Sequence, residues 1–288
     1  DFTEFDGNFY FIADNGVDES EVWKSDGTET GTVMLKDINE SGDGSPSNLF
    51  AFNDSLYFRA DNGVDGRELW KSDGTEAGTV MLKDINELGG SSPVNFVAFN
   101  GSLYFTADNG VDGSELWKSD GTEAGTVMLK DINESDSSFP SHFVALNGSL
   151  YFTADNGIDG RELWKSDGTE AGTVMLKDIN ESGSGTPIYT VVFNGSLYFR
   201  ANNGVDGNEL WKSDGTEAGT VMFKDINELG SSSPGSNFIA LNGSLYFTAD
   251  NGVDGRELWK SDGTEAGTVM LKDIDELDGS FPGNFIAF

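Results

Sequence analysis

Short acidic turns recur along the chain and carry its most chemically suggestive residues. Each reads DNGVDG or a close variant, with two carboxylates and an amide within five residues. Carboxylate and amide oxygens are ligands that calcium prefers. The candidate calcium ligands are Asp14, Asp18, Asp61, Asp65, Asp108, Asp112, Asp155, Asp159, Asp206, Asp250 and Asp254. In the fifth copy Asn202 replaces the first carboxylate, which predicts the weakest site there.

A purely structural interpretation of these turns is also open. Asp, Asn and Gly are the residues that tight turns favour. The spacing differs from that of an EF-hand loop, in which ligands alternate and a distant Glu completes the site. The sequence therefore favours structural turns, with calcium binding as the alternative.

Six tryptophans are possible platforms for carbohydrate, because a sugar ring can stack on an indole. The candidate carbohydrate-binding residues are Trp23, Trp70, Trp117, Trp164, Trp211 and Trp259. Glu68 and Lys71 stand close to Trp70 and could orient a ligand. The surrounding ELWKS strand equally suits a packed core tryptophan, and this interpretation is favoured.

A catalytic centre is not expected. The one histidine, His142, lies beside Pro140 in a variable connection, with no sign of the nucleophile and carboxylate that a triad needs. Glycoside hydrolysis needs two carboxylates in unlike environments, whereas near-identical repeats supply like ones. The absence of Cys excludes a thiolate nucleophile. We expect no enzyme and no catalytic residues.

The tryptophans also measure an internal repeat. They are separated by 47, 47, 47, 47 and 48 residues, a period typical of propeller blades or helical arrays. In residues 96–142, the Asn100-Gly101 pair joins two apolar runs as a hairpin turn. The DNGVDG turn follows the second strand and leads into SELWKS, the third strand. The DGTEAG turn then leads into TVMLKDI, the fourth strand. Each repeat is therefore predicted to form four short antiparallel strands.

Because the strands are apolar on both faces, each sheet is expected to pack between two others. The sequence predicts an all-β, six-bladed β-propeller in a single domain over residues 1–288. The repeats span approximately 2–48, 49–95, 96–142, 143–189, 190–237 and 238–284.

The first strand of a blade occurs seven times, whereas the other three strands occur six times. The predicted copies are Phe2–Phe5, Leu49–Phe52, Phe96–Phe99, Phe143–Leu146, Thr190–Phe193, Phe238–Leu241 and the extra copy Phe285–Phe288. An unmatched strand could pair with another molecule, so we expect possible self-assembly through it.

The stretch ELWKSDGTEAGT resembles the ELWxxDGT repeat of large bacterial secreted or surface proteins, and this resemblance covers essentially the whole chain. It implies an extracellular repeat module without catalytic activity. The blade plan is also similar to kelch repeats in architecture, although the double glycine of kelch is missing.

The composition limits the partners. Fifty Asp and Glu against 17 Lys and Arg give a net charge of −33, which should repel nucleic acid and anionic membranes. The surface could instead attract divalent cations or basic partners. No apolar run approaches the roughly 20 residues of a membrane helix, so no membrane insertion is expected. The chain lacks a recognisable signal peptide, and we expect a mature or excised segment.

Two functions remain open. The first is a non-catalytic scaffold for adhesion or assembly, outside the cell or on its surface. The second is a multivalent carbohydrate-binding lectin with repeated sites between blades, and a calcium-dependent form of it is open as well.

Overall fold

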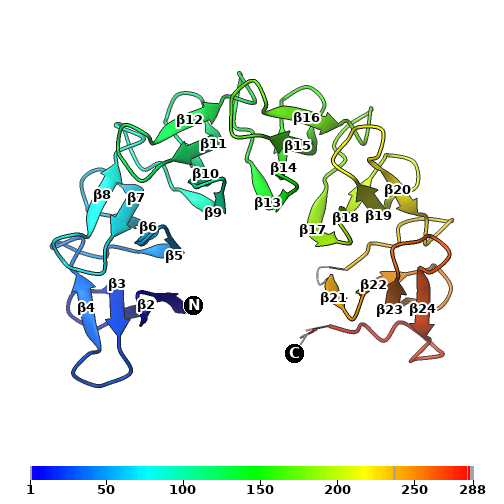
Figure 1. Ribbon diagram of the computed structural model, residues 1–288, viewed down its shortest axis with the longest axis horizontal. Coiled ribbons are helices and arrows are strands. Elements are labelled where there is room, and N and C mark those ends of the chain that lie inside the picture. The colour runs from blue at the N-terminus through cyan, green and yellow to red at the C-terminus, as the bar shows by residue number, and fades with distance from the viewer. Residues whose placement is uncertain (1, 236–237, 284, 286–288) are drawn as a thin grey trace. The chain divides into compact units, whose positions relative to one another are not determined.

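The computed structural model describes residues 2–235, 238–283 and 285. These residues form 24 strands, and none of them lies in a helix. No helix able to cross a membrane is found in this part of the chain. The strands group into six four-stranded sheets in which each strand pairs with the next one in sequence (Figure 1). We call these sheets blades 1 to 6.

The strand bounds repeat closely from blade to blade. Blade 1 contains β1 (Phe2–Phe5), β2 (Asn8–Asp14), β3 (Ser20–Ser25) and β4 (Val33–Lys36), and blade 2 contains β5 (Ser47–Phe52), β6 (Ser55–Asp61), β7 (Arg67–Ser72) and β8 (Val80–Lys83). Blade 3 contains β9 (Val94–Phe99), β10 (Ser102–Asp108), β11 (Ser114–Ser119) and β12 (Val127–Lys130), and blade 4 contains β13 (Ser141–Leu146), β14 (Ser149–Asp155), β15 (Arg161–Ser166) and β16 (Val174–Lys177). Blade 5 contains β17 (Ile188–Phe193), β18 (Ser196–Asn202), β19 (Asn208–Ser213) and β20 (Val221–Lys224), and blade 6 contains β21 (Ile239–Leu241), β22 (Ser244–Asp250), β23 (Arg256–Ser261) and β24 (Val269–Lys272).

The predicted hairpin turn between the first two strands is confirmed. Asn100 and Gly101 both have positive φ, at 47° and 76°. This conformation suits the twist of the two flanking strands, and Asn and Gly adopt it readily. In blade 2 Asp54 takes the glycine position with φ of 55°, which is uncommon for a residue other than glycine.

The first strands of blades 2 to 5 begin earlier than predicted. In blade 3 the structure gives Val94–Phe99 where Phe96–Phe99 is expected, because the strand continues past a bulge opposite β10. Asn95 at this bulge has φ of 60°, and polar residues in such a conformation look like loop in the sequence. In blade 6 the strand is Ile239–Leu241, one residue shorter than predicted. Of the extra copy Phe285–Phe288, residues 286–288 lie outside the described residues.

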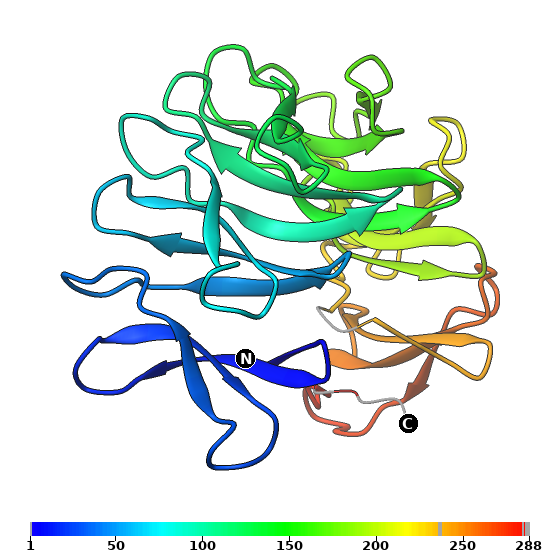
Figure 2. The same cartoon turned by 60° about the vertical axis from the view of Figure 1, so that its left-hand side comes forward.

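The chain divides into two compact units, residues 1–140 with blades 1 to 3 and residues 141–288 with blades 4 to 6. Within the first unit, blue to green in Figure 2, successive blades stack face against face. The assignment of all six repeats to one domain remains a prediction.

Each blade has two apolar faces, as the consecutive buried residues Leu56, Tyr57 and Phe58 illustrate. We call the face that carries Tyr10, Val22, Leu35 and Ile38 in blade 1, and their copies elsewhere, the leading face. The face that carries Leu56, Phe58, Trp70 and Met81 in blade 2, and their copies, is the trailing face. The leading face of blade 1 packs on the trailing face of blade 2, and the pairs 2–3, 4–5 and 5–6 repeat this arrangement.

Candidate functional site

Every blade buries one glutamate from its third strand. Glu21, Glu68, Glu115, Glu162, Glu209 and Glu257 are all 0% exposed. In blade 3 the Glu115 carboxylate accepts hydrogen bonds from the Ile132 N–H (2.8 Å), the Ser138 N–H (2.8 Å) and the Ser138 hydroxyl (2.6 Å). The carboxylate therefore ties the third strand to the connection that leads to the next blade. In the sequence Glu68 stands out only as a neighbour of Trp70, and this structural role was not predicted.

Burial raises the pKa of Glu21, Glu115 and Glu162 to about 7, against the opposing effect of their hydrogen bonds. The hydroxyl donor is not present in every blade, because Gly44 and Gly185 replace the serine in blades 1 and 4. Glu162 therefore accepts hydrogen bonds from the Ile179 N–H and the Gly185 N–H but from no hydroxyl at this position. At Glu257 burial raises the pKa less than the hydrogen bonds from Ser280 and Ile274 lower it, so this pKa lies below its ordinary value. The other five glutamates stand in similar environments rather than in the contrasting pair that acid–base catalysis needs.

A second carboxylate of each blade follows the fourth strand and is only partly satisfied. The residues are Asp37, Asp84, Asp131, Asp178, Asp225 and Asp273, and in each the Oδ1 atom is buried without a hydrogen-bond partner. Burial, then the neighbouring carboxylates Asp159 and Glu181, raise the pKa of Asp178. These aspartates were not predicted as site residues. The KDI segment that contains them is repeated in every blade, which was the one signal in the sequence. This repetition does not show whether a carboxylate has hydrogen-bond partners.

The predicted calcium ligands are held within their own turns. In blade 2 Asp61 accepts from the Gly63 N–H (2.8 Å), Asn62 donates to Asp65 (2.7 Å), and Asn62 Oδ1 accepts from the Val64 N–H (3.0 Å). The first carboxylates Asp14, Asp61, Asp108, Asp155 and Asp250 all accept from the glycine two residues on. The second carboxylates Asp18, Asp65, Asp112, Asp159, Asp206 and Asp254 all accept from the turn asparagine.

Asn202 makes the bond of the first carboxylate equally well, at 2.7 Å to the Gly204 N–H, so the turn needs an oxygen there and not a charge. Across the described residues, no three or more His, Cys, Asp or Glu side chains form a group that could hold a metal ion. Calcium binding by these turns remains a prediction.

The tryptophans lie on the trailing faces. Trp70, Trp117, Trp164, Trp211 and Trp259 are 5–6% exposed, whereas Trp23 is half-buried. Trp70 stacks on Phe58 at 6.4 Å between ring centroids, and its Nε1 donates to the Ala60 carbonyl at 3.1 Å. Stacking of a sugar requires an exposed ring face, and this packing leaves little of it. Carbohydrate stacking on the tryptophans remains a prediction that the burial does not favour.

A cavity of about 590 Å³ lies between blades 4 and 5. Its walls are the segment Lys177–Ser182 of blade 4 and Asn203, Val205 and Trp211 of blade 5. Asp178 is therefore a wall residue of a recess whose other walls include the charged Lys177 and Glu181 as well as apolar and amide side chains. A small polar molecule with an apolar side would fit this combination.

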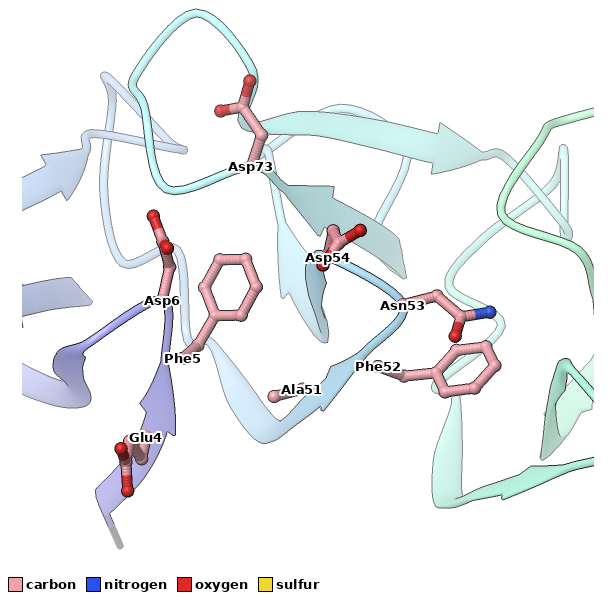
Figure 3. A pocket seen from close by; sticks show the side chains of 8 residues that line it. All are labelled: Glu4, Phe5, Asp6, Ala51, Phe52, Asn53, Asp54 and Asp73. Atoms are coloured by element: carbon pink, nitrogen blue, oxygen red, sulfur yellow. The ribbon is translucent and has the colours of Figure 1, made fainter.

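A second cavity, of about 600 Å³, lies between blades 1 and 2 (Figure 3). In Figure 3 the Phe5 ring occupies the middle of the group, with Asp6 and Asp73 beside and above it. Three of its four carboxylates depart from the repeat, since Glu4, Asp6 and Asp54 stand where other blades have Ala or Val, Asn, and Gly. All four carboxylates are exposed, and the recess can attract cations but contains no nucleophile with an adjacent base.

His142 lies on the bulge of β13. Its Nδ1 is 3.2 Å from Ser141 Oγ, and burial, then the Arg161 charge, lower its pKa. A triad histidine has a carboxylate beside it, whereas a cation influences this one.

No family model matches the chain, and no curated protein matches it. Solved structures do resemble it. The computationally designed Ika8 protein has a TM-score of 0.50 at 13% identity, over 90% of this chain and 69% of that one. Prolyl oligopeptidase B from Galerina marginata, bound to a 25mer macrocyclization substrate, has a TM-score of 0.57 at 12% identity, over 96% of this chain and 43% of that one.

A puromycin hydrolase mutant complexed with PGG has a TM-score of 0.54 at 15% identity, over 93% of this chain and 44% of that one. The chain thus spans less than half the length of these two peptidases. The matched parts are β-propeller domains, so the predicted all-β fold with six propeller blades is confirmed. At these identities the likeness extends to the fold alone.

Proposed function

We propose that this chain is a non-catalytic scaffold that assembles with further copies of itself, outside the cell or on its surface. The observation that supports this most directly is that each compact unit leaves one terminal blade face uncovered by its own blades, the trailing face of blade 1 and the leading face of blade 6. On the leading faces Leu35, Leu82 and Leu176 are 3–9% exposed, whereas Leu271 of blade 6 is 46% exposed. On the trailing faces Leu56, Leu103, Leu197 and Leu245 are 0% exposed, whereas Phe9 of blade 1 is 53% exposed.

These exposed faces are the two halves of one repeated interface. Elsewhere the same leading residues pack on the same trailing residues, so the face of blade 6 matches the face of blade 1 of a second copy. Fully burying one such apolar side chain stabilises an interface by about 1.5–3 kcal/mol. The contact would be heterologous, which joins molecules head to tail.

Polar contacts repeat across the same interfaces. Lys24 Nζ donates to the Gly74 carbonyl of the next blade at 2.7 Å, and Lys36 Nζ to the Thr79 carbonyl at 3.0 Å. The copies of these lysines in blade 6 are Lys260 and Lys272. In a head-to-tail pair they would meet the carbonyls of Gly27 and Thr32 in blade 1 of the second molecule.

The remaining support is indirect. Near-identical repeats place equal groups in every blade, which suits a scaffold better than a single reaction centre. The resemblance to ELWxxDGT repeats and the absence of Cys agree with an extracellular module, and the family assignment belongs to this proposal.

Sedimentation velocity over a wide range of concentrations tests the proposal. We expect the chain to associate with rising concentration, and Leu271→Glu or Phe9→Glu to abolish this. Val253→Glu is the matched control, because Val253 is 82% exposed in a turn outside both faces. Deletion of Phe285–Phe288 tests the extra strand separately. A chain that stays monomeric at every concentration contradicts the proposal.

A lectin is the second candidate, and the cavity between blades 4 and 5 favours it. This cavity combines Trp211, an exposed Val205 and the carboxylate-bearing Asp178. Retention on immobilised glycans, with and without calcium, tests it. A saturable rise in melting temperature with calcium, reversed by chelator, would support the calcium-dependent form, since a ligand of the native state raises stability. No shift with calcium would contradict that form.

A further inference from the structure

The connection after blade 6 is folded like the connections that lead into a further blade. In blade 2 the Ser91 N–H and hydroxyl donate to Glu68 at 2.7 and 2.5 Å, and blade 3 follows. In blade 6 the Ser280 N–H and hydroxyl donate to Glu257 at 2.8 and 2.5 Å. The connection after blade 6 is therefore tied to its own third strand in the way that precedes a first strand elsewhere.

The next residue of this connection repeats the agreement. Ser92 has φ of 48°, and its N–H donates to the Arg67 carbonyl at 2.8 Å. Phe281 has φ of 50°, and its N–H donates to the Arg256 carbonyl at 3.1 Å. Positive φ is uncommon for a residue with a side chain, so the two connections share a specific backbone path as well as a sequence pattern.

Phe285 lies where this path delivers a first strand. It lines an apolar recess of about 210 Å³ on the leading face of blade 6, whose other walls are Ile239, Leu241, Tyr246 and Leu258. Its copy Phe238 stands directly before β21 and packs on the leading face of blade 5. Blade 6 therefore carries the beginning of another first strand on its leading face.

The middle of β1 fits its blade less well than the C-terminal copy would. The position of Thr3 is occupied by Phe50 in blade 2 and Val144 in blade 4, and these side chains pack in the apolar interfaces between blades. Thr3 instead donates its hydroxyl to the Leu49 carbonyl at 3.3 Å. In the C-terminal copy this position is Ile286, which lies outside the described residues. An isoleucine there would bury more apolar surface than a threonine.

Glu4 adds a charge that the other first strands lack. Its position is alanine or valine in all of them, including Ala287 of the C-terminal copy, which lies outside the described residues. One recess between blades 1 and 2 is lined by Glu4, Asp6, Asp54 and Asp73 (Figure 3). Like charges at one site repel one another, and a strand without Glu4 relieves part of this repulsion. β1 is thus the weaker occupant of its own position.

We propose that the strand Phe285–Phe288 of one copy replaces β1 in blade 1 of a second copy and pairs antiparallel with β2. This inference rests on the proposed head-to-tail assembly and gives it a mechanism. In the register of β1, where Phe5 lies opposite Asn8, the incoming Phe288 lies opposite Asn8 and Phe285 lies opposite Phe11. The backbone hydrogen bonds that β1 gives up are replaced by equal ones, so the incoming side chains and the packing of the terminal faces supply the gain.

The length of the connection sets the geometry of this contact. Residues 275–284 lead from blade 6 to Phe285, and residues 86–95, equal in number, lead from blade 2 to Phe96. Exchange therefore places the leading face of blade 6 on the trailing face of blade 1 of the second copy, as blade 2 packs on blade 3. The strand and the two faces form one heterologous contact, which joins molecules head to tail.

Disulfide cross-linking tests the strand pair, and the chain suits it because it contains no Cys. Asn8→Cys combined with Phe288→Cys places two thiols opposite each other in the exchanged pair. Opposite residues on antiparallel strands have Cα atoms about 4.5–5.5 Å apart, within the span of a disulfide. Under mild oxidation we expect dimers and higher oligomers on a non-reducing gel, and dithiothreitol should return them to single chains. The control combines Phe288→Cys with Val253→Cys, because Val253 is 82% exposed in a turn outside the strand pair.

Each result of this experiment is informative. Cross-links that form only within one chain overturn the exchange, and so do cross-links that are equally abundant in the control. A chain that associates in sedimentation velocity without cross-linking also overturns the exchange but leaves head-to-tail assembly standing. A chain that neither associates nor cross-links contradicts the proposed function itself.

Two substitutions separate strand exchange from packing with β1 in place. Glu4→Val gives β1 the residue that blade 5 has at Val192, which makes β1 a stronger competitor. Exchange then predicts association about fivefold weaker in sedimentation velocity. Packing with β1 in place predicts unchanged or stronger association, and that result overturns the exchange. The reverse transfer, Ala287→Glu, should weaken association by a similar factor, and unchanged association would again overturn the exchange.

Discussion

Each blade contains two carboxylates that are largely hidden from solvent, and their surroundings differ sharply. In blade 3 these are Glu115 on the third strand and Asp131 after the fourth, 16 residues apart. Glu115 accepts three hydrogen bonds from the connection that follows, whereas Asp131 Oδ1 accepts none. Both residues are copied six times, so copying alone does not distinguish a carboxylate with hydrogen-bond partners from one whose Oδ1 has none. What distinguishes them is whether backbone or side-chain donors lie within hydrogen-bond distance.

The largest expected effect follows from removing the satisfied carboxylate. Glu115→Ala leaves the Ile132 N–H and the Ser138 N–H and hydroxyl without their acceptor, and we expect a loss of about 3 kcal/mol or more. Urea unfolding followed by tryptophan fluorescence measures it. Glu115→Gln keeps one acceptor and should lose less. A loss no greater than that of Asp131→Ala would remove the contrast between the two carboxylates.

The pH dependence should sharpen the same comparison. Burial raises the pKa of Glu21, Glu115 and Glu162 from about 4.5 to about 7, so the folded chain holds these protons more tightly than the unfolded chain. Their stabilising contribution is complete below pH 4.5 and is lost as pH rises towards 7. We expect the melting temperature to be several degrees higher near pH 5 than at pH 7.5.

The exposed corner aspartates, such as Asp73, act in the opposite direction. Hydrogen bonds from Thr75 lower the pKa of Asp73, so its contribution disappears as pH falls below its ordinary range near 4. Thermal unfolding between pH 3 and 8 should therefore show a maximum near pH 4–5. Glu115→Gln should flatten the upper limb of this curve. A melting temperature that rises from pH 5 to 7.5 would contradict the raised pKa values of the buried glutamates.

A smaller effect is expected where a glutamate lacks its hydroxyl partner. A Cβ at Gly185 would lie 2.5 Å from Glu162 Oε2 and 2.7 Å from Ile179 Cβ, so both the carboxylate and the Ile179 segment must shift. Gly185→Ser adds the hydroxyl that Ser138 supplies to Glu115, and we expect it to be about 1 kcal/mol more stable than Gly185→Ala. Gly185→Ala adds the same Cβ without the hydroxyl and should destabilise the blade. Equal effects of the two substitutions would show that the hydroxyl is irrelevant.

The smallest effect on stability is expected at Asp178, whose Oδ1 has no hydrogen-bond partner. Asp178→Asn removes a charge that lies near Asp159 and Glu181 and breaks no hydrogen bond of Oδ1, so the change should be within about 0.5 kcal/mol or slightly stabilising. Asp155→Asn is the matched control in the same blade. Thermal unfolding of both variants measures the change in the free energy of unfolding. A loss above about 2 kcal/mol for Asp178→Asn would show that Asp178 Oδ1 has a structural partner.

Much of the fold could be read from local sequence. The Asn100-Gly101 turn, the DNGVDG turns and the apolar runs each act over a few residues, and the structure confirms four strands per blade from them. The bulge at Asn95 was missed because a residue with positive φ inside a strand resembles the loop that precedes it. The extra first strand remains a prediction.

The site was less predictable, for a physical reason. The partner of Glu115 is Ser138, 23 residues further on, and the walls around Asp178 include Val205 and Trp211 of the next blade. Short-range patterns cannot report such contacts.

The sequence by itself determined the repeat, its period and the meander of each blade, because turn chemistry and strand preference are local properties. Only the tertiary structure decided which carboxylate is fully hydrogen-bonded and which has a buried oxygen without a partner. That outcome depends on where the donors of the connections and of the neighbouring blade come to lie once the faces pack.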